Sequence, residues 1–154
     1  MKIIYIHHGH RKSGNPAGPD DDLTTLGYKD CQLVAELLDI MPHKQQIKAI
    51  YTSPYFRCKK TAEIINQNLN LKIIEDERLN EYNFSTETWL FAQTRITECI
   101  EDIIKQYKED DYVICVTSGI NVGPFITKAY GLKPSPTAPK LGVPSCSPIV
   151  FEYN

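Results

Sequence analysis

Residues 3–10 read Ile3-Ile4-Tyr5-Ile6-His7-His8-Gly9-His10. This stretch is an apolar run that ends in three histidines gathered around one glycine. The run has the length of a buried strand, and the glycine marks the place where the chain turns out of it. Side chains at this point lie at the carboxyl end of a strand, where open α/β sheets bind their ligands. Imidazole has a pKa near neutrality, so these histidines are candidate nucleophiles, bases or metal ligands.

The composition is that of an ordinary globular protein. The chain has 154 residues, of which 42% are hydrophobic and 23% are charged, and this length predicts a single domain over residues 1–154. The formal net charge of −2, without a basic cluster, argues against a nucleic-acid partner. No apolar stretch approaches the roughly 20 residues that span a membrane, and the start of the chain lacks the features of a signal peptide. We therefore expect a cytoplasmic protein, and the oligomeric state stays open.

The cysteines give no sign of a disulfide framework or a zinc ribbon. They are odd in number, widely spaced and include no Cys-x-x-Cys pair. We expect most of them to be small core residues, with Cys115 as the clearest case because it lies inside an apolar run. The five are Cys31, Cys58, Cys99, Cys115 and Cys146.

Short strand-like runs alternate with longer helical patterns along the chain. Strands are predicted at 2–7, 47–52, 71–75, 112–116 and 149–153, and helices at 24–39, 53–68, 87–108 and 121–130. A loop rich in Gly, Pro and Asp is predicted from Ser13 to Asp22. The alternation implies a mostly parallel sheet between two helical layers, an α/β/α three-layer sandwich. The pattern leaves the orientation of the last strand open.

The helix starts and faces can be predicted in more detail. Thr24 is the expected N-cap of the first helix, and Ser53-Pro54 is expected to open the second. The expected apolar face of the first helix consists of Leu26, Leu33, Val34, Leu37 and Leu38.

Three further segments follow predicted strands and carry chemically active side chains. They are Ser53-Pro54-Tyr55-Phe56-Arg57, Leu79-Asn80-Glu81 and Thr117-Ser118-Gly119. Because the carboxyl ends of parallel strands meet at one edge, we expect these segments to share a crevice with the histidines. Histidine, arginine and helix amides together are typical of a phosphate site.

These motifs, in this order, resemble those of the histidine phosphatase superfamily, which has the phosphoglycerate mutase-like fold. The matching elements are His-Gly after the first strand, Leu23-Thr24-Thr25-Leu26-Gly27, Ser53-Pro54-x-x-Arg57-x-x-x-Thr61-Ala62 and Leu79-x-Glu81. The short length is most similar to the compact bacterial phosphohistidine phosphatases. The resemblance implies a hydrolase that acts on a small phosphorylated substrate or a phosphohistidine protein, with no metal and no cofactor.

The resemblance also implies a role for each site residue. His8 would attack phosphorus and carry a transient phosphohistidine, while Arg57 would hold the phosphoryl oxygens. Glu81 would protonate the leaving oxygen and then activate water, provided that its pKa is raised. The other expected phosphate-binding residues are His7, His10, Ser118 and Gly119.

Two positions depart from the family pattern. His7 occupies the place of the family's arginine in Arg-His-Gly, and Ser118 occupies the place of its second histidine. Losing one preorganised donor at a developing charge costs on the order of 3–4 kcal/mol, or about 100- to 1,000-fold in rate. We therefore expect slow turnover, unless His10 and Arg11 supply replacement charge.

Several alternatives remain open at this point. His7 alternates with His8 along the strand, so its side chain can also face the opposite layer, and Ser118 can serve only as a cap of the following helix. The main functional alternative is a pseudophosphatase that binds a phosphorylated ligand without turnover. A less favoured one is a metal-dependent hydrolase that uses His8-x-His10, because two histidines flanking a glycine resemble metal ligands.

Overall fold

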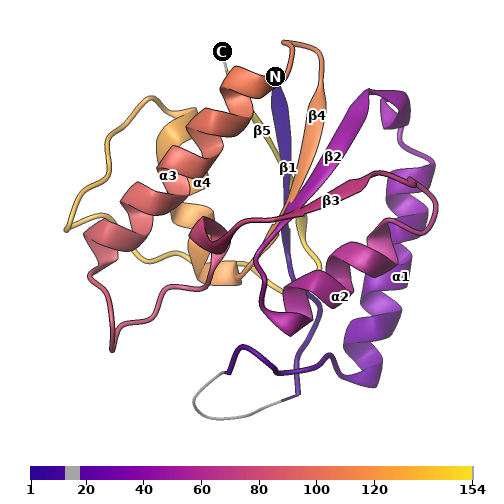
Figure 1. Ribbon diagram of the computed structural model, residues 1–154, viewed down its shortest axis with the longest axis horizontal. Coiled ribbons are helices and arrows are strands. Elements are labelled where there is room, and N and C mark those ends of the chain that lie inside the picture. The colour runs from indigo at the N-terminus through magenta and orange to yellow at the C-terminus, as the bar shows by residue number, and fades with distance from the viewer. Residues whose placement is uncertain (13–17, 154) are drawn as a thin grey trace.

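The computed structural model describes residues 1–12 and 18–153. Five strands and four helices form the three-layer α/β/α arrangement predicted from the sequence (Figure 1). Part of the predicted loop from Ser13 to Asp22 lies outside the described residues. The strands are β1 (Lys2–His7), β2 (Ile47–Thr52), β3 (Lys72–Glu75), β4 (Tyr112–Thr117) and β5 (Pro148–Glu152), and the helices are α1 (Thr25–Asp39), α2 (Phe56–Ile65), α3 (Trp89–Gln106) and α4 (Val122–Ala129).

The sheet has the strand order β3-β2-β4-β1-β5. The first four strands in this order are parallel, and β5 pairs antiparallel with β1. Helices α1 and α2 cover one face, and α3 and α4 cover the other (Figure 1). The carboxyl ends of the four parallel strands consequently meet at one edge of the sheet.

Alternate residues of β1 contribute to two separate cores because successive side chains of a strand point to opposite faces. Ile3 and Tyr5 pack among α3 and α4, whereas Ile4 and Ile6 pack against α1 and α2. Most of the buried polar side chains gather instead near the carboxyl ends of the strands: His8, Thr52, Ser53, Arg57, Thr61, Thr117, Ser118 and Asn121. Because burying a polar group without a partner is costly, this concentration marks the candidate site.

The predicted helix starts are partly correct. Thr24 is the N-cap of α1, and its side chain accepts a hydrogen bond from the Gly27 amide, as expected. Helix α2 begins at Phe56, so Ser53-Pro54 lies before the helix rather than in its first turn. Ser53 still orders the residues that lead into α2, because its hydroxyl accepts a hydrogen bond from the Tyr55 amide at 3.3 Å.

The expected apolar face of α1 is wrong for three of its five members. Val34 and Leu38 are buried, but Leu26, Leu33 and Leu37 are exposed. The reason is that α1 packs sideways on α2, so only Val34 and Leu38 of these five join the core beneath the helix. Its buried stripe therefore follows Gly27, Cys31, Val34, Ala35 and Leu38.

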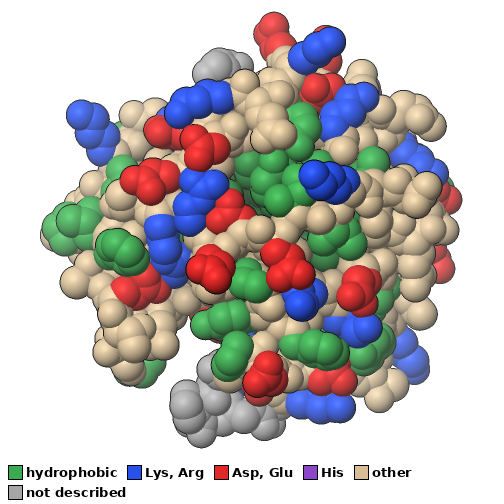
Figure 2. All heavy atoms as spheres, viewed as in Figure 1, with side chains coloured by type: hydrophobic (Ala, Val, Ile, Leu, Met, Phe, Trp, Pro, Cys, Tyr) green, Lys and Arg blue, Asp and Glu red, His purple; other side chains and the backbone are tan. Residues whose placement is uncertain are grey.

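No helix among the residues that the structure describes has both the length and the apolar character needed to cross a membrane. On the face drawn in Figure 2, acidic and basic side chains are interspersed around smaller apolar areas.

Candidate active site

His8 lies immediately after β1 and is 4% exposed. Its Nδ1 is 2.8 Å from the Gly9 carbonyl oxygen, and its Nε2 is 3.0 Å from Nε of Arg57. A carbonyl only accepts and a guanidinium only donates, so the proton must sit on Nδ1 and the lone pair on Nε2. The arrangement leaves Nε2 as the nucleophilic nitrogen of this ring.

Burial keeps His8 uncharged. Desolvation, together with the neighbouring charges of His7 and Arg57, lowers the pKa of His8 to about 3. The imidazole is therefore neutral at pH 7, which is the protonation state that a nitrogen nucleophile requires.

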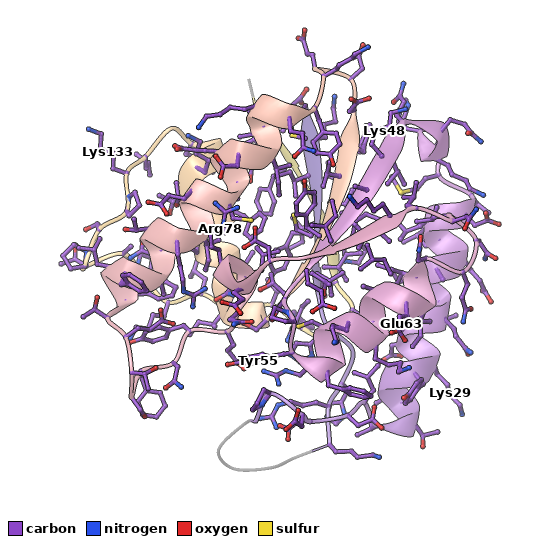
Figure 3. All side chains as sticks on the ribbon, in the orientation of Figure 1. Lys29, Lys48, Tyr55, Glu63, Arg78 and Lys133 are labelled. Atoms are coloured by element: carbon purple, nitrogen blue, oxygen red, sulfur yellow. The ribbon has the colours of Figure 1, made fainter. Side chains whose placement is uncertain are left out.

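Arg57 comes from the first turn of α2 and is fully buried. Each of its three nitrogens has a partner: Nε donates to His8, one terminal nitrogen donates to the Gly18 carbonyl at 2.7 Å, and the other donates to Glu81 at 2.5 Å. The Tyr55 ring, labelled in Figure 3, packs 4.9 Å from the guanidinium carbon. The guanidinium thus joins the candidate nucleophile to the candidate acid.

His7 lies beside His8, with the two ring centres 4.4 Å apart. Its Nδ1 donates to the Val143 carbonyl at 2.8 Å, and burial lowers its pKa. In the neutral ring Nε2 can only accept a hydrogen bond, so His7 donates to an anion only after protonation. This differs from arginine, which remains charged.

Gly119 allows the His7 ring to approach β4. A Cβ at Gly119 would lie 2.8 Å from the His7 ring and 2.9 Å from the Val143 carbonyl. Glycine is therefore needed here for close approach, and this is a packing reason for Gly119 besides its predicted role at the phosphate.

Ser118 is buried, and its hydroxyl oxygen has no hydrogen-bond partner within residues 1–12 and 18–153. Ser118 occupies the N-cap position of the following turn, as the alternative prediction expected, but its side chain makes no capping hydrogen bond there. Leaving a buried hydroxyl unpaired costs about 1–3 kcal/mol. A ligand that accepts a hydrogen bond from Ser118 would recover that cost.

His10 is placed differently from the other histidines. Its side chain is exposed, and its Nδ1 lies 2.9 Å from the hydroxyl of Thr24, the N-cap of α1. The structure thus brings His7, His8, Arg57 and Glu81 together, while His10 is engaged at the start of α1. Its role as a phosphate ligand stays a prediction.

Thr61 has a positioning role that the sequence motif alone did not indicate. Its hydroxyl accepts from the Gly9 amide at 3.0 Å and donates to the Arg57 carbonyl at 2.8 Å. It therefore ties the turn after His8 to α2. The regular spacing Arg57-x-x-x-Thr61, one helical turn, was the signal that could have revealed it.

Arg95 of α3 fixes the segment that carries Glu81. Its guanidinium donates to the carbonyls of Arg78 at 2.6 Å and Asn80 at 2.8 Å, and it pairs with Glu87 at 2.6 Å. The Asn121 amide group adds bonds to the carbonyls of Leu79 and Asn80 from the other side. No sequence pattern indicated these long-range contacts.

A cavity of about 660 Å³ opens beside Glu81. Aromatic rings and one cation dominate its wall, and Nζ of Lys140 lies 4.9 Å from the centre of the Tyr82 ring. The lining residues are Tyr55, Glu81, Tyr82, Asn83, Phe84, Ser85, Ile120 and Lys140. The cavity therefore adjoins the candidate acid, Glu81.

A metal site of the predicted His8-x-His10 type would need further ligands. Among the described residues, no group of three or more His, Cys, Asp or Glu side chains is arranged to hold a metal ion. His8 and His10 instead engage Arg57 and Thr24.

Residues 4–88 match the model of the histidine phosphatase superfamily, branch 1. The chain belongs to this superfamily. Phosphoserine phosphatase 1 of Hydrogenobacter thermophilus is 27% identical over 115 residues, which are 71% of this chain and 48% of that protein. "Putative phosphoserine phosphatase 2" of the same organism is 41% identical over 90 residues, which are 54% of this chain and 42% of that protein. The chain thus spans about half the length of the curated relatives it matches.

Several solved structures share the fold. YhfR of Bacillus stearothermophilus superimposes with a TM-score of 0.80 at 19% identity, covering 97% of this chain and 89% of that one. A phosphoserine phosphatase from Entamoeba histolytica gives 0.75 at 20% identity, with 97% and 89% covered. The protein histidine phosphatase SixA gives 0.66 at 19% identity, with 88% and 81% covered. At these identities the likeness establishes the fold alone.

Proposed function

We propose that this superfamily member is a metal-independent phosphatase that forms a phosphohistidine at Nε2 of His8. The observation that carries the proposal is the contact of that nitrogen with Arg57, whose guanidinium also holds Glu81. A phosphate bound here replaces His8 and Glu81 as the partner of the arginine. Nε2 is then free to attack phosphorus. The Glu81 carboxylate, released from the arginine, takes up a proton from the monoanionic phosphate ester or from water and gives it to the leaving oxygen. Water activated by Glu81 then releases phosphate and restores the neutral imidazole.

The substrate that we favour is a small phosphomonoester rather than a phosphohistidine protein. The names of the two curated relatives describe phosphoserine phosphatases. The cavity beside Glu81 supports the same choice, because its aromatic wall suits a compact leaving group and Lys140 suits a carboxylate on it.

The second candidate is a protein that binds a phosphorylated ligand without hydrolysing it. Its support is the state of the two replaced ligands: His7 is neutral at pH 7 because burial lowers its pKa, and Ser118 carries no charge. An uncharged residue at each of these two positions weakens the stabilisation of transition-state charge more than it weakens the binding of the ligand.

The test is the release of inorganic phosphate from phosphoserine, p-nitrophenyl phosphate and a phosphohistidine peptide. The parent should be slow, His8→Ala should be inactive, and the double variant His7→Arg/Ser118→His should be roughly 100-fold or more faster than the parent. When the reaction is quenched rapidly without acid, phosphate should be found attached to His8.

The outcomes separate the candidates. Equal activity of His8→Ala and the parent overturns the catalytic proposal. Binding of phosphoserine by calorimetry, with neither turnover nor a phosphoenzyme, supports the second candidate. Activity confined to the phosphohistidine peptide overturns our choice of substrate.

A further inference from the structure

Cys31 and Cys146 bring two free thiols into contact behind the candidate active site. Their sulfur atoms are 3.5 Å apart, although the residues are 115 positions apart in the sequence. Cys31 lies in α1 and is fully buried, whereas Cys146 lies just before β5 and is partly exposed. A disulfide needs about 2.05 Å between the sulfurs, so a movement of roughly 1.5 Å is enough to form the bond.

One member of the pair, Cys146, reaches the surface. Cys146 lines a depression of about 370 Å³ between α1 and the segment before β5, together with Leu33, Leu37 and Ser145. A small oxidant can therefore reach the Cys146 thiol in the folded protein. The backbone of Cys146 has φ +55°, a conformation that a side chain other than that of Gly, Asn or Asp rarely adopts.

The contact is also linked to His7 and to Gly9, the residue that follows His8. The Cys146 amide donates to the His7 carbonyl at 2.9 Å, and three residues earlier the Val143 carbonyl accepts from Nδ1 of the His7 ring. On the other side, Cys31 packs on Gly9: a Cβ at Gly9 would lie 2.7 Å from its sulfur. A bond between the two sulfurs would thus join α1 to the segment that holds His7.

We infer that Cys31 and Cys146 are a redox modification site, which a peroxide converts into an intramolecular disulfide. One thiol sulfur attacks a peroxide oxygen, breaks the O–O bond and becomes a sulfenic acid as water leaves. The second thiol displaces the hydroxyl from that sulfur, forms the S–S bond and releases a second water. Two thiols lose two electrons and two protons, and the peroxide is reduced. This inference does not depend on the proposed phosphatase activity.

The experiment treats the folded protein with stoichiometric hydrogen peroxide, alkylates the remaining thiols and maps the peptides by mass spectrometry. We expect one linked pair, Cys31 with Cys146, while Cys58, Cys99 and Cys115 remain as thiols because they are buried. The bond closes a loop of more than 100 residues, so the midpoint of thermal unfolding should rise by roughly 10 °C and return after treatment with dithiothreitol.

Two variants make the result decisive. Cys146→Ser should abolish both the linked peptide and the thermal shift, whereas Cys115→Ala, in the core of β4, should keep both. Cys31→Ala gives a second test of the pair if the serine variant folds poorly. The inference is overturned if peroxide leaves Cys31 and Cys146 open to alkylation, or oxidises them separately without a bond between them.

Discussion

Arg57 places a permanent positive charge where solvent does not reach it. Such a charge is tolerated only when it is paired and hydrogen-bonded. Here Glu81 supplies the opposite charge, and Glu81, the Gly18 carbonyl and the His8 lone pair accept the hydrogen bonds of the guanidinium. Three side chains of the candidate site therefore stabilise one another. The motif residues were predictable because their types and spacing are fixed by the chemistry. The positioning roles of Thr61, although it belongs to the motif, and of Arg95 were not predicted, since they depend on contacts between distant segments.

The low pKa of His8 makes stability dependent on pH. His8 is neutral when folded and has an ordinary pKa of 6.5 when unfolded, against about 3 in the fold. Between pH 3 and pH 6.5 the unfolded state binds more protons than the folded state. The contribution of neutral His8 to the free energy of unfolding is therefore complete above pH 6.5 and is lost as the pH falls toward 3. From pH 7 to pH 4 the parent should lose about 3 kcal/mol more than His8→Asn in the free energy of unfolding. Urea titrations at each pH measure this, and parallel pH curves for the two proteins would contradict it.

Arg95 should act on turnover through Glu81 rather than through substrate contact. Arg95→Lys keeps the charge but cannot reach the carbonyls of Arg78 and Asn80 and the carboxylate of Glu87 together, so the Glu81 segment shifts. We expect kcat to fall roughly ten- to hundred-fold with little change in KM. Lys105→Ala, at the exposed end of the same helix, is the control and should match the parent. A change in KM alone would show that Arg95 serves binding instead.

At the scale of single elements, the close approach of α1 to the turn after β1 decides where His8 sits. Gly27 allows this approach, because a Cβ there would lie only 2.2 Å from the His10 carbonyl oxygen. The motif containing Gly27 was visible in the sequence. The contact that explains the glycine was not, since it joins two segments whose packing only the fold defines.

Gly27→Ala should therefore destabilise the protein, although Gly→Ala within a helix normally stabilises by about 1 kcal/mol. The backbone clash should outweigh that gain and cost roughly 1–3 kcal/mol. Gly123→Ala in α4 is the matched control, since its Cβ would meet only ordinary contacts, the nearest at 3.6 Å, and it should be neutral or stabilising. Thermal unfolding compares the two, and equal effects would refute the explanation.

The exposed leucines of α1 show where periodicity misleads. Leu33 and Leu38 both fit the predicted apolar face, but Leu33 is 62% exposed and Leu38 is 0% exposed. We expect Leu38→Ala to cost about 2–5 kcal/mol and Leu33→Ala to stay within about 0.5 kcal/mol of the parent. Denaturant titration measures both. A large cost for Leu33→Ala would indicate that a partner covers this face.

At the scale of the whole molecule, the alternation of strands and helices was enough to predict the layers and the parallel sheet. The direction of β5 was not predictable, because it follows a long connection whose path depends on tertiary packing. Its antiparallel pairing with β1 brings the two ends of the chain together (Figure 1). Met1 and Tyr153 exchange two backbone hydrogen bonds, each 2.9 Å long.

This pairing predicts a tolerated circular permutation. Replacing Asn154 by a two-residue Asn-Gly link between Tyr153 and Met1 would make β5 and β1 a hairpin, because such a turn closes a pair of this kind. New ends can be opened between Glu109 and Asp110, which are exposed in the turn before β4. We expect circular dichroism to show the same fold, with a midpoint of thermal unfolding within several degrees of the parent. Loss of cooperative unfolding would contradict the prediction.

The ion pair of Arg57 with Glu81 also bears on how a ligand arrives. Because the two charges largely cancel at a distance, they project little attractive field into the surrounding water. A phosphorylated molecule is then not drawn in from afar by this arginine. It gains the attraction only after it has entered and displaced the carboxylate, so selection among anions takes place by exchange at short range, where the salt of the medium has little influence.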